Sequence, residues 1–383
     1  MEASDLRVAL FSGNYNYVRD GANQALNRLV GHLLDRGVKV RVYSPTVAEP
    51  AFPPTGDLVS IPSWPLPGKR AEFRFALHLS RAVRDDLAAF APNMIHVSAP
   101  EIIGHAAIGY ARKQGLPVVA SLHTRFETYP RYYHFGFFEP LVVGMLTRFY
   151  NKVDAVMTPG QSMTDLLRSW GVTTPVHIWS RGVDHDRFRP EARDLAWRRE
   201  LGIADDEVAV GFLGRLVLEK GLDVFAEVIA DLKAQGVRHR VLVIGEGPAR
   251  GWFAERVPDA VFAGFQSGDN LCRAVASMDV LFNPSVTETF GNVTLEAMAS
   301  HVPVVAARAT GAVDLIDDGI TGYLVPPRDH AAYADAIARL AQDDDLRRAA
   351  GAAGVARAAA YRWDRINEAV IDTYLEVMAR LGK

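Results

Sequence analysis

The chain has 383 residues, of which 49% are hydrophobic and 23% charged; this is the composition of an ordinary globular protein, and the length favours two domains. The single cysteine, Cys272, excludes disulfides within the chain and zinc sites built from several cysteines. No uncharged apolar run approaches the ~18 residues of a membrane-spanning helix, and the acidic N-terminus does not resemble a signal peptide. We therefore expect a cytoplasmic protein.

The formal net charge of −3 is unevenly distributed along the chain. Residues 1–181 carry 19 Lys and Arg against 14 Asp and Glu, whereas the remainder carries 23 against 31. A basic first half is suited to an anionic membrane surface or an acidic acceptor, although chance placement is the alternative.

The first half alternates strand-like and helix-like segments. Apolar runs at 7–11, 38–43, 94–97, 118–122, 155–157 and 176–179 predict strands, and amphipathic stretches at 22–34, 73–90 and 102–113 predict helices. Such alternation indicates a parallel sheet that is covered on both faces.

The second half repeats this pattern. It has predicted strands at 208–213, 241–244, 260–263, 280–282 and 302–306, and predicted helices at 222–235, 270–277, 293–300, 331–341 and 364–381. The polar segment 182–201 between the halves is interpreted as a hinge. We therefore predict two doubly wound domains that face a cleft, with ligands at the carboxyl ends of the strands.

The most informative segment of the second half is 283–296. A strand leads into a turn at 289–292 that opens a helix, with Glu288 before the turn and Glu296 one helical turn beyond it. The first amides of a helix lack internal partners and carry the positive end of its dipole, so they suit a phosphate. The segment could hold a diphosphate between two carboxylates that bind sugar hydroxyls; ordinary surface glutamates are the alternative.

Two cations follow the first strand of this half. Arg215 and Lys220 lie five residues apart, just after Gly214, where they could neutralise a diphosphate leaving group. The turn at 245–251 imitates a dinucleotide fingerprint but has the wrong spacing, so it predicts a tight turn lining a nucleotide cleft.

In the first half, a glycine-containing loop at 11–21 and His123 follow predicted strands. Gly13 and Gly21 would let the backbone approach a ligand, and His123 is followed by polar residues typical of an open loop rather than a core. The 11 histidines show no metal-ligand spacing.

Basic and aromatic residues are interleaved in two segments, 65–75 and 125–148, which suits a membrane interface or a hydrophobic acceptor pocket as well as it suits aromatic packing. The residues expected at such an acceptor or membrane surface are Lys69, Arg70, Arg74, Arg125, Tyr129, Arg131 and Tyr132. Nucleic acid is not an expected partner, because the chain is acidic overall and has no recognised module.

Together these features resemble the retaining glycosyltransferases of family 4. The likeness is carried by Glu288 with Glu296, by Arg215 with Lys220, by His123, and by the segment 181–184 with the residues after it. It spans essentially the whole chain. The segment 123–129 resembles bacterial GDP-mannose-dependent mannosyltransferases and sulfoquinovosyl- or glycosyl-diacylglycerol synthases in particular.

The resemblance implies the GT-B fold: two Rossmann-like domains, an acceptor domain at 1–181 and a donor domain at 202–363, with the C-terminal helix 364–383 crossing back to the first. It implies that Arg215 and Lys220 hold the donor diphosphate, that Glu288 binds the donor sugar, and that His123 lies near the sugar and the acceptor. The residues expected to bind the donor are Gly13, Gly21, Gly245, Glu246, Phe265, Thr289, Phe290, Gly291, Asn292, Val293, Thr294 and Glu296.

The implied reaction is hexose transfer from a nucleotide-diphosphate sugar, with GDP-mannose favoured over a UDP-sugar, to a lipid or glycan acceptor at or near a membrane. It needs no metal or other cofactor, and the protein contributes orientation and electrostatics. A UDP-sugar epimerase on the same fold and a non-catalytic nucleotide-sugar-binding module are the alternatives, and a dehydrogenase is the weakest interpretation.

Overall fold

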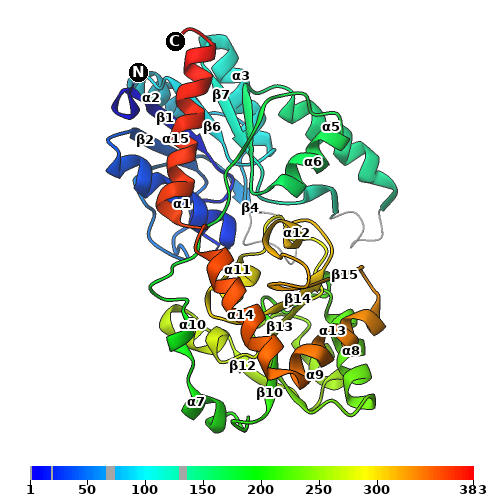
Figure 1. Cartoon of the computed structure of the whole chain (residues 1–383). Coiled ribbons are helices and arrows are strands. Elements are labelled where there is room, and N and C mark those ends of the chain that lie inside the picture. Colours follow the sequence, from blue (N-terminus) through cyan, green and yellow to red (C-terminus); the bar gives the residue numbers. More distant parts are fainter. Residues whose placement is uncertain (1, 19, 66–73, 129–135) are drawn as a thin grey trace. The chain divides into compact units, whose positions relative to one another are not determined.

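The structure is a computed structural model that describes residues 2–18, 20–65, 74–128 and 136–383 (Figure 1). The chain divides into two compact units. Unit 1 comprises Met1–Arg181 and Trp363–Lys383, and unit 2 comprises Gly182–Arg362.

Unit 1 is built on a seven-stranded parallel sheet with the strand order β3-β2-β1-β6-β7-β8-β9. Its strands are β1 (Arg7–Phe11), β2 (Lys39–Ser44), β3 (Asp57–Ser60), β6 (Met94–Val97), β7 (Val118–Ser121), β8 (Ala155–Thr158) and β9 (Val176–Ile178). The central strands are buried on both faces, which explains their continuous apolar sequences.

Helices cover both faces of this sheet. They are α1 (Gly21–Asp35), α2 (Arg81–Phe90), α3 (Ile102–Gln114), α5 (Glu139–Tyr150), α6 (Gln161–Ser169) and α15 (Trp363–Arg380). On one face α1 and α15 pack together over a core that includes Leu29 and Tyr374, and on the other α2, α3 and α5 bury Leu87, Ala107 and Phe149. Figure 1 shows α15, the red end of the chain, beside α1. The expected return of the C-terminal helix to the first half is thus confirmed.

One predicted helix is wrong over its first part. The amphipathic stretch 73–90 becomes a helix only from Arg81, where the Ser80 side chain accepts a hydrogen bond from the amide of Val83. Upstream, β5 (Arg74–Phe75) pairs antiparallel with β4 (Trp64–Pro65) instead. The short β4–β5 pairing and the Ser80 cap have overridden the amphipathic helical pattern here.

Unit 2 contains a six-stranded parallel sheet with the order β12-β11-β10-β13-β14-β15. Its strands are β10 (Val208–Leu213), β11 (His239–Ile244), β12 (Val261–Gly264), β13 (Val280–Asn283), β14 (Val304–Ala307) and β15 (Gly322–Val325). The strand order reverses beside β10, so the loops after β10 and β13 leave the same edge of the sheet at the switch point where ligands bind in such folds.

The helices of unit 2 are α7 (Leu195–Glu200), α8 (Leu222–Ala234), α9 (Arg250–Arg256), α10 (Gly268–Ala276), α11 (Asn292–Ala299), α12 (Ala312–Leu315), α13 (His330–Gln342) and α14 (Asp344–Ala358). One core lies between the sheet and α8, α9 and α13, and a second lies between the sheet and α10, α11 and α12. Both units are therefore Rossmann-like doubly wound sheets, as predicted.

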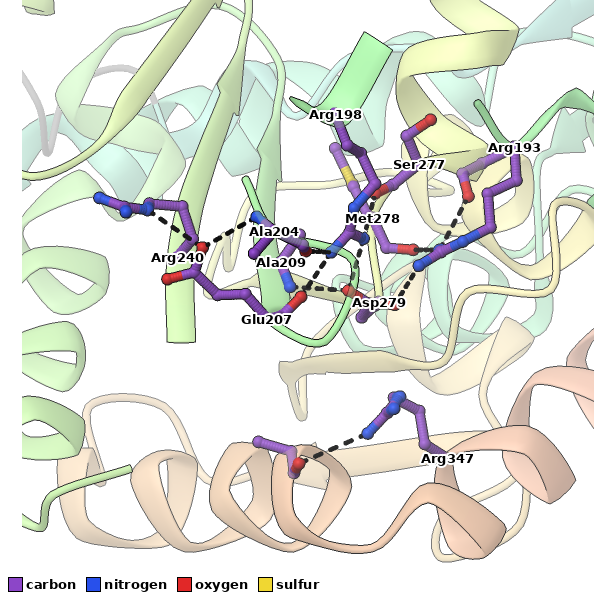
Figure 2. A network of polar contacts seen from close by, with 12 residues as sticks. Arg193, Arg198, Ala204, Glu207, Ala209, Arg240, Ser277, Met278, Asp279 and Arg347 are labelled. Atoms are coloured by element: carbon purple, nitrogen blue, oxygen red, sulfur yellow. Dashed lines mark hydrogen bonds and ion pairs between the residues drawn. The ribbon is translucent and has the colours of Figure 1, made fainter. Parts of the chain in front are cut away.

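The segment 182–201 contains α7 and is bonded to the body of unit 2 (Figure 2). Fully buried Arg198 and partly exposed Arg193 both donate to the carboxylate of Asp279, at 2.7 and 2.6 Å, and the amide of Ala209 donates to it at 2.7 Å. Burial raises the pKa of Asp279, but the two guanidinium groups outweigh that effect and hold the pKa below its usual value. This network joins α7 to the amino ends of β10 and β13, at the opposite edge of the sheet from the loops considered next.

Candidate functional site

The loop after β13 delivers the start of α11 to the carboxyl edge of the unit 2 sheet. Gly291 is the N-cap of α11, with φ +98°, a left-handed conformation that favours glycine; among the residues that the structure describes, no side chain caps this end of the helix. The first amides of α11 are therefore available to a ligand with negative charge, as the sequence predicts.

Glu288 and Lys220 meet at this edge, although 68 residues separate them in the sequence. Lys220 Nζ donates to Glu288 Oε1 at 2.6 Å, and both side chains are partly buried, with exposed fractions of 33% and 18%. Burial alone would raise the pKa of Glu288, but the Lys220 ammonium and the Ser285 hydroxyl together lower it. Glu288 is thus held as a carboxylate beside a cation.

Arg215 lies on the loop after β10 that leads to Lys220. Its side chain is exposed and forms no ion pair with any residue that the structure describes. The Lys220–Glu288 pair, the exposed Arg215 and the start of α11 thus lie on loops at the switch point of the sheet.

Glu296 lies one turn inside α11 and is half-buried. Its carboxyl group forms no hydrogen bond within the described part of the chain, and burial raises the pKa of Glu296 to about 8. A partly buried carboxyl group without a partner is suited to exchanging hydrogen bonds with a ligand hydroxyl.

The glycines of the turn after β11 are required by a close approach of two loops. A Cβ on Gly245, whose φ is +135°, would lie 2.0 Å from the carbonyl oxygen of Gly214, and one on Gly247 would lie 2.4 Å from that of Leu216. The Leu216 amide also donates to the Glu246 carbonyl at 3.0 Å. These contacts hold the loop that carries Arg215 against the turn after β11.

The other residues expected at the donor site lie around these loops. Phe290 and Thr294 are buried, and Thr294 accepts a hydrogen bond from Asn283 Nδ2 at 3.4 Å. Thr289, Asn292 and Val293 are half-buried. Glu246 is exposed and pairs with Arg250 at 3.6 Å, while Phe265 is 67% exposed after β12.

In unit 1, the two glycines of the first loop have different surroundings. Gly13 faces the carboxylate of Glu101, which lies where a Cβ on Gly13 would stand, and burial raises the pKa of Glu101 to about 7. Gly21 is the first residue of α1, where the Asp20 carboxylate accepts from the amide of Asn23 at 2.8 Å. Glu101 was not singled out in the sequence.

His123 follows β7 and is half-buried. Its Nε2 lies 2.9 Å from Ser121 Oγ, and its Nδ1 accepts from the Arg181 guanidinium at 2.6 Å. Burial, and next the charge of Arg181, lower the pKa of His123 well below its usual value. Both ring nitrogens are thus engaged within unit 1.

Five of the residues expected at an acceptor or membrane surface, Lys69, Arg70, Tyr129, Arg131 and Tyr132, lie outside the described residues. The two that are described have internal partners. Arg74 donates to Ser63 Oγ at 2.8 Å, and Arg125 pairs with buried Glu127 at 2.6 Å.

η3 (Gly136–Phe138) and α5 carry an apolar surface. Its residues were not named individually among the predicted site residues. Phe137, Phe138, Leu141 and Met145 are 73%, 45%, 57% and 56% exposed. Among the described residues, no helix is both long enough and apolar enough to cross a membrane.

Comparison with known proteins adds independent findings. The family model described as Glycosyltransferase Family 4 matches residues 19–187, and the one described as Glycosyl transferases group 1 matches residues 207–343. A GDP-mannose-dependent alpha-mannosyltransferase of Corynebacterium glutamicum is 28% identical over 98% of this chain and 90% of its own. The sulfoquinovosyl transferase SQD2 of Arabidopsis thaliana is 30% identical over 93% of this chain and 71% of its own.

Among solved structures, sucrose-phosphate synthase from Thermosynechococcus elongatus matches with a TM-score of 0.80 and 21% identity, over 98% of this chain and 100% of that one. This similarity supports the fold, and the predicted GT-B class is confirmed.

Proposed function

The chain belongs to glycosyltransferase family 4, and from that membership we propose that it transfers mannose from GDP-mannose, with retention of the anomeric configuration, to a lipid or membrane-associated glycan acceptor. Its relatives are glycosyltransferases that use nucleotide-sugar donors. The favoured sugar and base come from the printed names of relatives such as the mannosyltransferase of Corynebacterium glutamicum; a UDP-sugar is the second choice.

The observation that carries the proposal is the Lys220–Glu288 pair beside Arg215 and the uncapped start of α11. A nucleotide diphosphate is a leaving group whose negative charge grows as the bond to the sugar breaks. Lys220, Arg215 and the first amides of α11 would stabilise that charge without reorganisation at the moment of reaction. We propose that these groups act in place of a divalent metal.

We propose that the two carboxylates serve as hydroxyl ligands rather than as an acid–base couple. Glu288 is held ionised by Lys220, so it would accept hydrogen bonds from hydroxyls of the donor sugar. Glu296 has a raised pKa and no partner in the described chain, so it would bind the ribose hydroxyls. Phe265 and Glu246, at the ends of neighbouring strands, would contact the base.

Unit 1 is proposed to bind the acceptor and to supply His123. The basic first half and the exposed apolar residues of η3 and α5 support a peripheral contact with an anionic membrane at the cytoplasmic face. Arg125 would contribute little to such a surface, because its charge is already paired with Glu127.

A donor screen tests this proposal. The protein is incubated with GDP-mannose, GDP-glucose, UDP-glucose and UDP-galactose, with and without EDTA, and nucleotide diphosphate release and the anomeric proton of the product are followed by NMR. We expect release from GDP-mannose that EDTA does not abolish, and an α-linked product when a diacylglycerol or glycolipid acceptor is added. Release from none of the four sugars, a β-linked product, or conversion of the sugar to its epimer would contradict it.

A further inference from the structure

Unit 1 contains a continuous chain of buried polar groups that ends at His123. His96 on β6 and Ser121 on β7 are both fully buried. His96 Nε2 lies 3.0 Å from Ser121 Oγ, and His96 Nδ1 lies 2.6 Å from the hydroxyl of Tyr374 on α15. Because Ser121 Oγ also bonds to His123 Nε2, the chain runs from the C-terminal helix through two strands to His123.

The chemistry of the partners fixes the position of the proton on His123. A guanidinium has only donors, so Nδ1, which receives the Arg181 bond, must present its lone pair. The ring proton of His123 is therefore on Nε2, from which it is donated to Ser121 Oγ. Protonation of Nδ1 would direct an N–H at the Arg181 guanidinium 2.6 Å away, so the ring is neutral.

Aromatic contacts fix the plane of the ring as well. His123 meets buried Trp179 edge-to-face with centroids 5.2 Å apart, and Arg181 stacks over the same indole at 4.8 Å. Trp179 Nε1 donates to Asn367 of α15 at 3.2 Å. The C-terminal helix thus contacts the surroundings of His123 twice, through Tyr374 and through Asn367.

We propose that Ser121, His96 and Tyr374 are positioning residues that hold His123 as the neutral Nε2–H tautomer in one orientation for glycosyl transfer. His123 then acts as a fixed neutral group and not as a titrating acid or base. The kinetic part of this inference rests on the proposed function, whereas the tautomer can be measured without turnover.

The first test is NMR of protein labelled with ¹⁵N-histidine, assigned with a His123→Gln variant. We expect His123 to show the Nε2–H pattern from pH 6 to 8.5, with a slowly exchanging proton that is lost in Ser121→Ala. An Nδ1–H pattern, titration of His123 in this range, or an Nε2 proton unaffected by Ser121→Ala would overturn the proposal.

The second test compares donor turnover. Ser121→Ala is expected to lower kcat about 10-fold, the effect of losing one hydrogen bond to a group used in the reaction, with the donor KM within about two-fold. Tyr374→Phe should lower kcat by about two- to three-fold, because it removes only the hydrogen bond between Tyr374 and His96, which does not contact His123 directly. His177→Asn is the matched control, since His177 contacts Glu376 of α15 from β9 at 3.8 Å without reaching His123.

Equal kcat values for wild type, Ser121→Ala and His177→Asn would refute the positioning role, as would an equal loss in Ser121→Ala and the control. If the wild type turns over no nucleotide sugar, the proposed function fails. The NMR result alone then decides whether Ser121, His96 and Tyr374 hold His123 as the Nε2–H tautomer.

Discussion

Replacing Lys220 with methionine tests the role of positive charge at the carboxyl edge of unit 2. Lys220 Nζ lies 2.6 Å from Glu288 Oε1, and the Lys220 side chain is 33% exposed, so the cation is near the surface but partly desolvated. A charge about 4 Å from a diphosphate oxygen gives about 4 kcal/mol at an effective dielectric constant of about 20. After allowance for solvent screening, about 3 kcal/mol remains, which corresponds to a loss of about 10²-fold in kcat/KM for the donor.

A double-mutant cycle separates this role from mere support of Glu288. If Lys220 only holds Glu288 in place, K220M combined with E288Q should be no less active than E288Q alone. If Lys220 stabilises the leaving diphosphate, the double variant should be about 10- to 100-fold less active than E288Q. Initial rates of nucleotide diphosphate release give both values.

The matched control is Lys233→Met. Lys233 pairs with Asp259 at 2.8 Å, and both side chains are exposed and lie away from the loops of the candidate site. We expect wild-type turnover in this variant. A K220M enzyme with kcat/KM within about three-fold of Lys233→Met, and equally well folded by circular dichroism, would refute the electrostatic role of Lys220.

Three further predictions concern unit 2. Asp279→Asn should destabilise the protein by about 3 kcal/mol or more at pH 7, because it leaves the buried charge of Arg198 without its carboxylate. Because the pKa of Asp279 is lowered in the fold, this stabilisation is lost as the pH falls through that lowered pKa, and thermal melts of variant and wild type should converge at acid pH. Glu296→Gln should stabilise the unliganded protein, because burial raises the pKa of Glu296 to about 8 and ionisation of this carboxyl group destabilises the fold. The gain in the free energy of unfolding should grow from pH 5 to pH 8 towards about 1–3 kcal/mol, and a pH-independent difference would contradict this. Gly245→Ala should lower the free energy of unfolding by about 2 kcal/mol or more and weaken donor binding in calorimetry, whereas Gly251→Ala, with open space around its Cβ, should be neutral or slightly stabilising.

Much of the donor-site prediction rested on local sequence. Glu288 and Glu296 flank the start of α11 as predicted, because a buried strand, a glycine with positive φ and a helix-forming run determine that turn locally. Arg215 and Lys220 likewise follow β10 as expected. Strand–helix alternation was sufficient for the fold class, since each buried parallel strand has a continuous apolar sequence.

Other features depend on contacts that the helix and strand periodicity does not show. The helix predicted from residue 73 begins at Arg81, because 74–75 pair with β4 and Ser80 caps the helix. The importance of Gly245 follows from the carbonyl of Gly214 on another loop rather than from the imitation of a dinucleotide fingerprint. The Gly245–Gly214 contact joins two loops that are distant in the sequence, and no local pattern indicates it.

The sequence by itself determined two doubly wound units and the turn that carries Glu288 and Glu296, because periodicity, glycines and helix starts are local properties of the chain. Only the tertiary structure decided how the charges are compensated. It joined Lys220 to Glu288 across 68 residues, left Glu296 without a partner in the described chain, and linked His123 to Tyr374 through His96 and Ser121. Ionisation and tautomer depend on burial and on the nearest opposite charge or hydrogen-bond partner, and these are set by packing between distant segments.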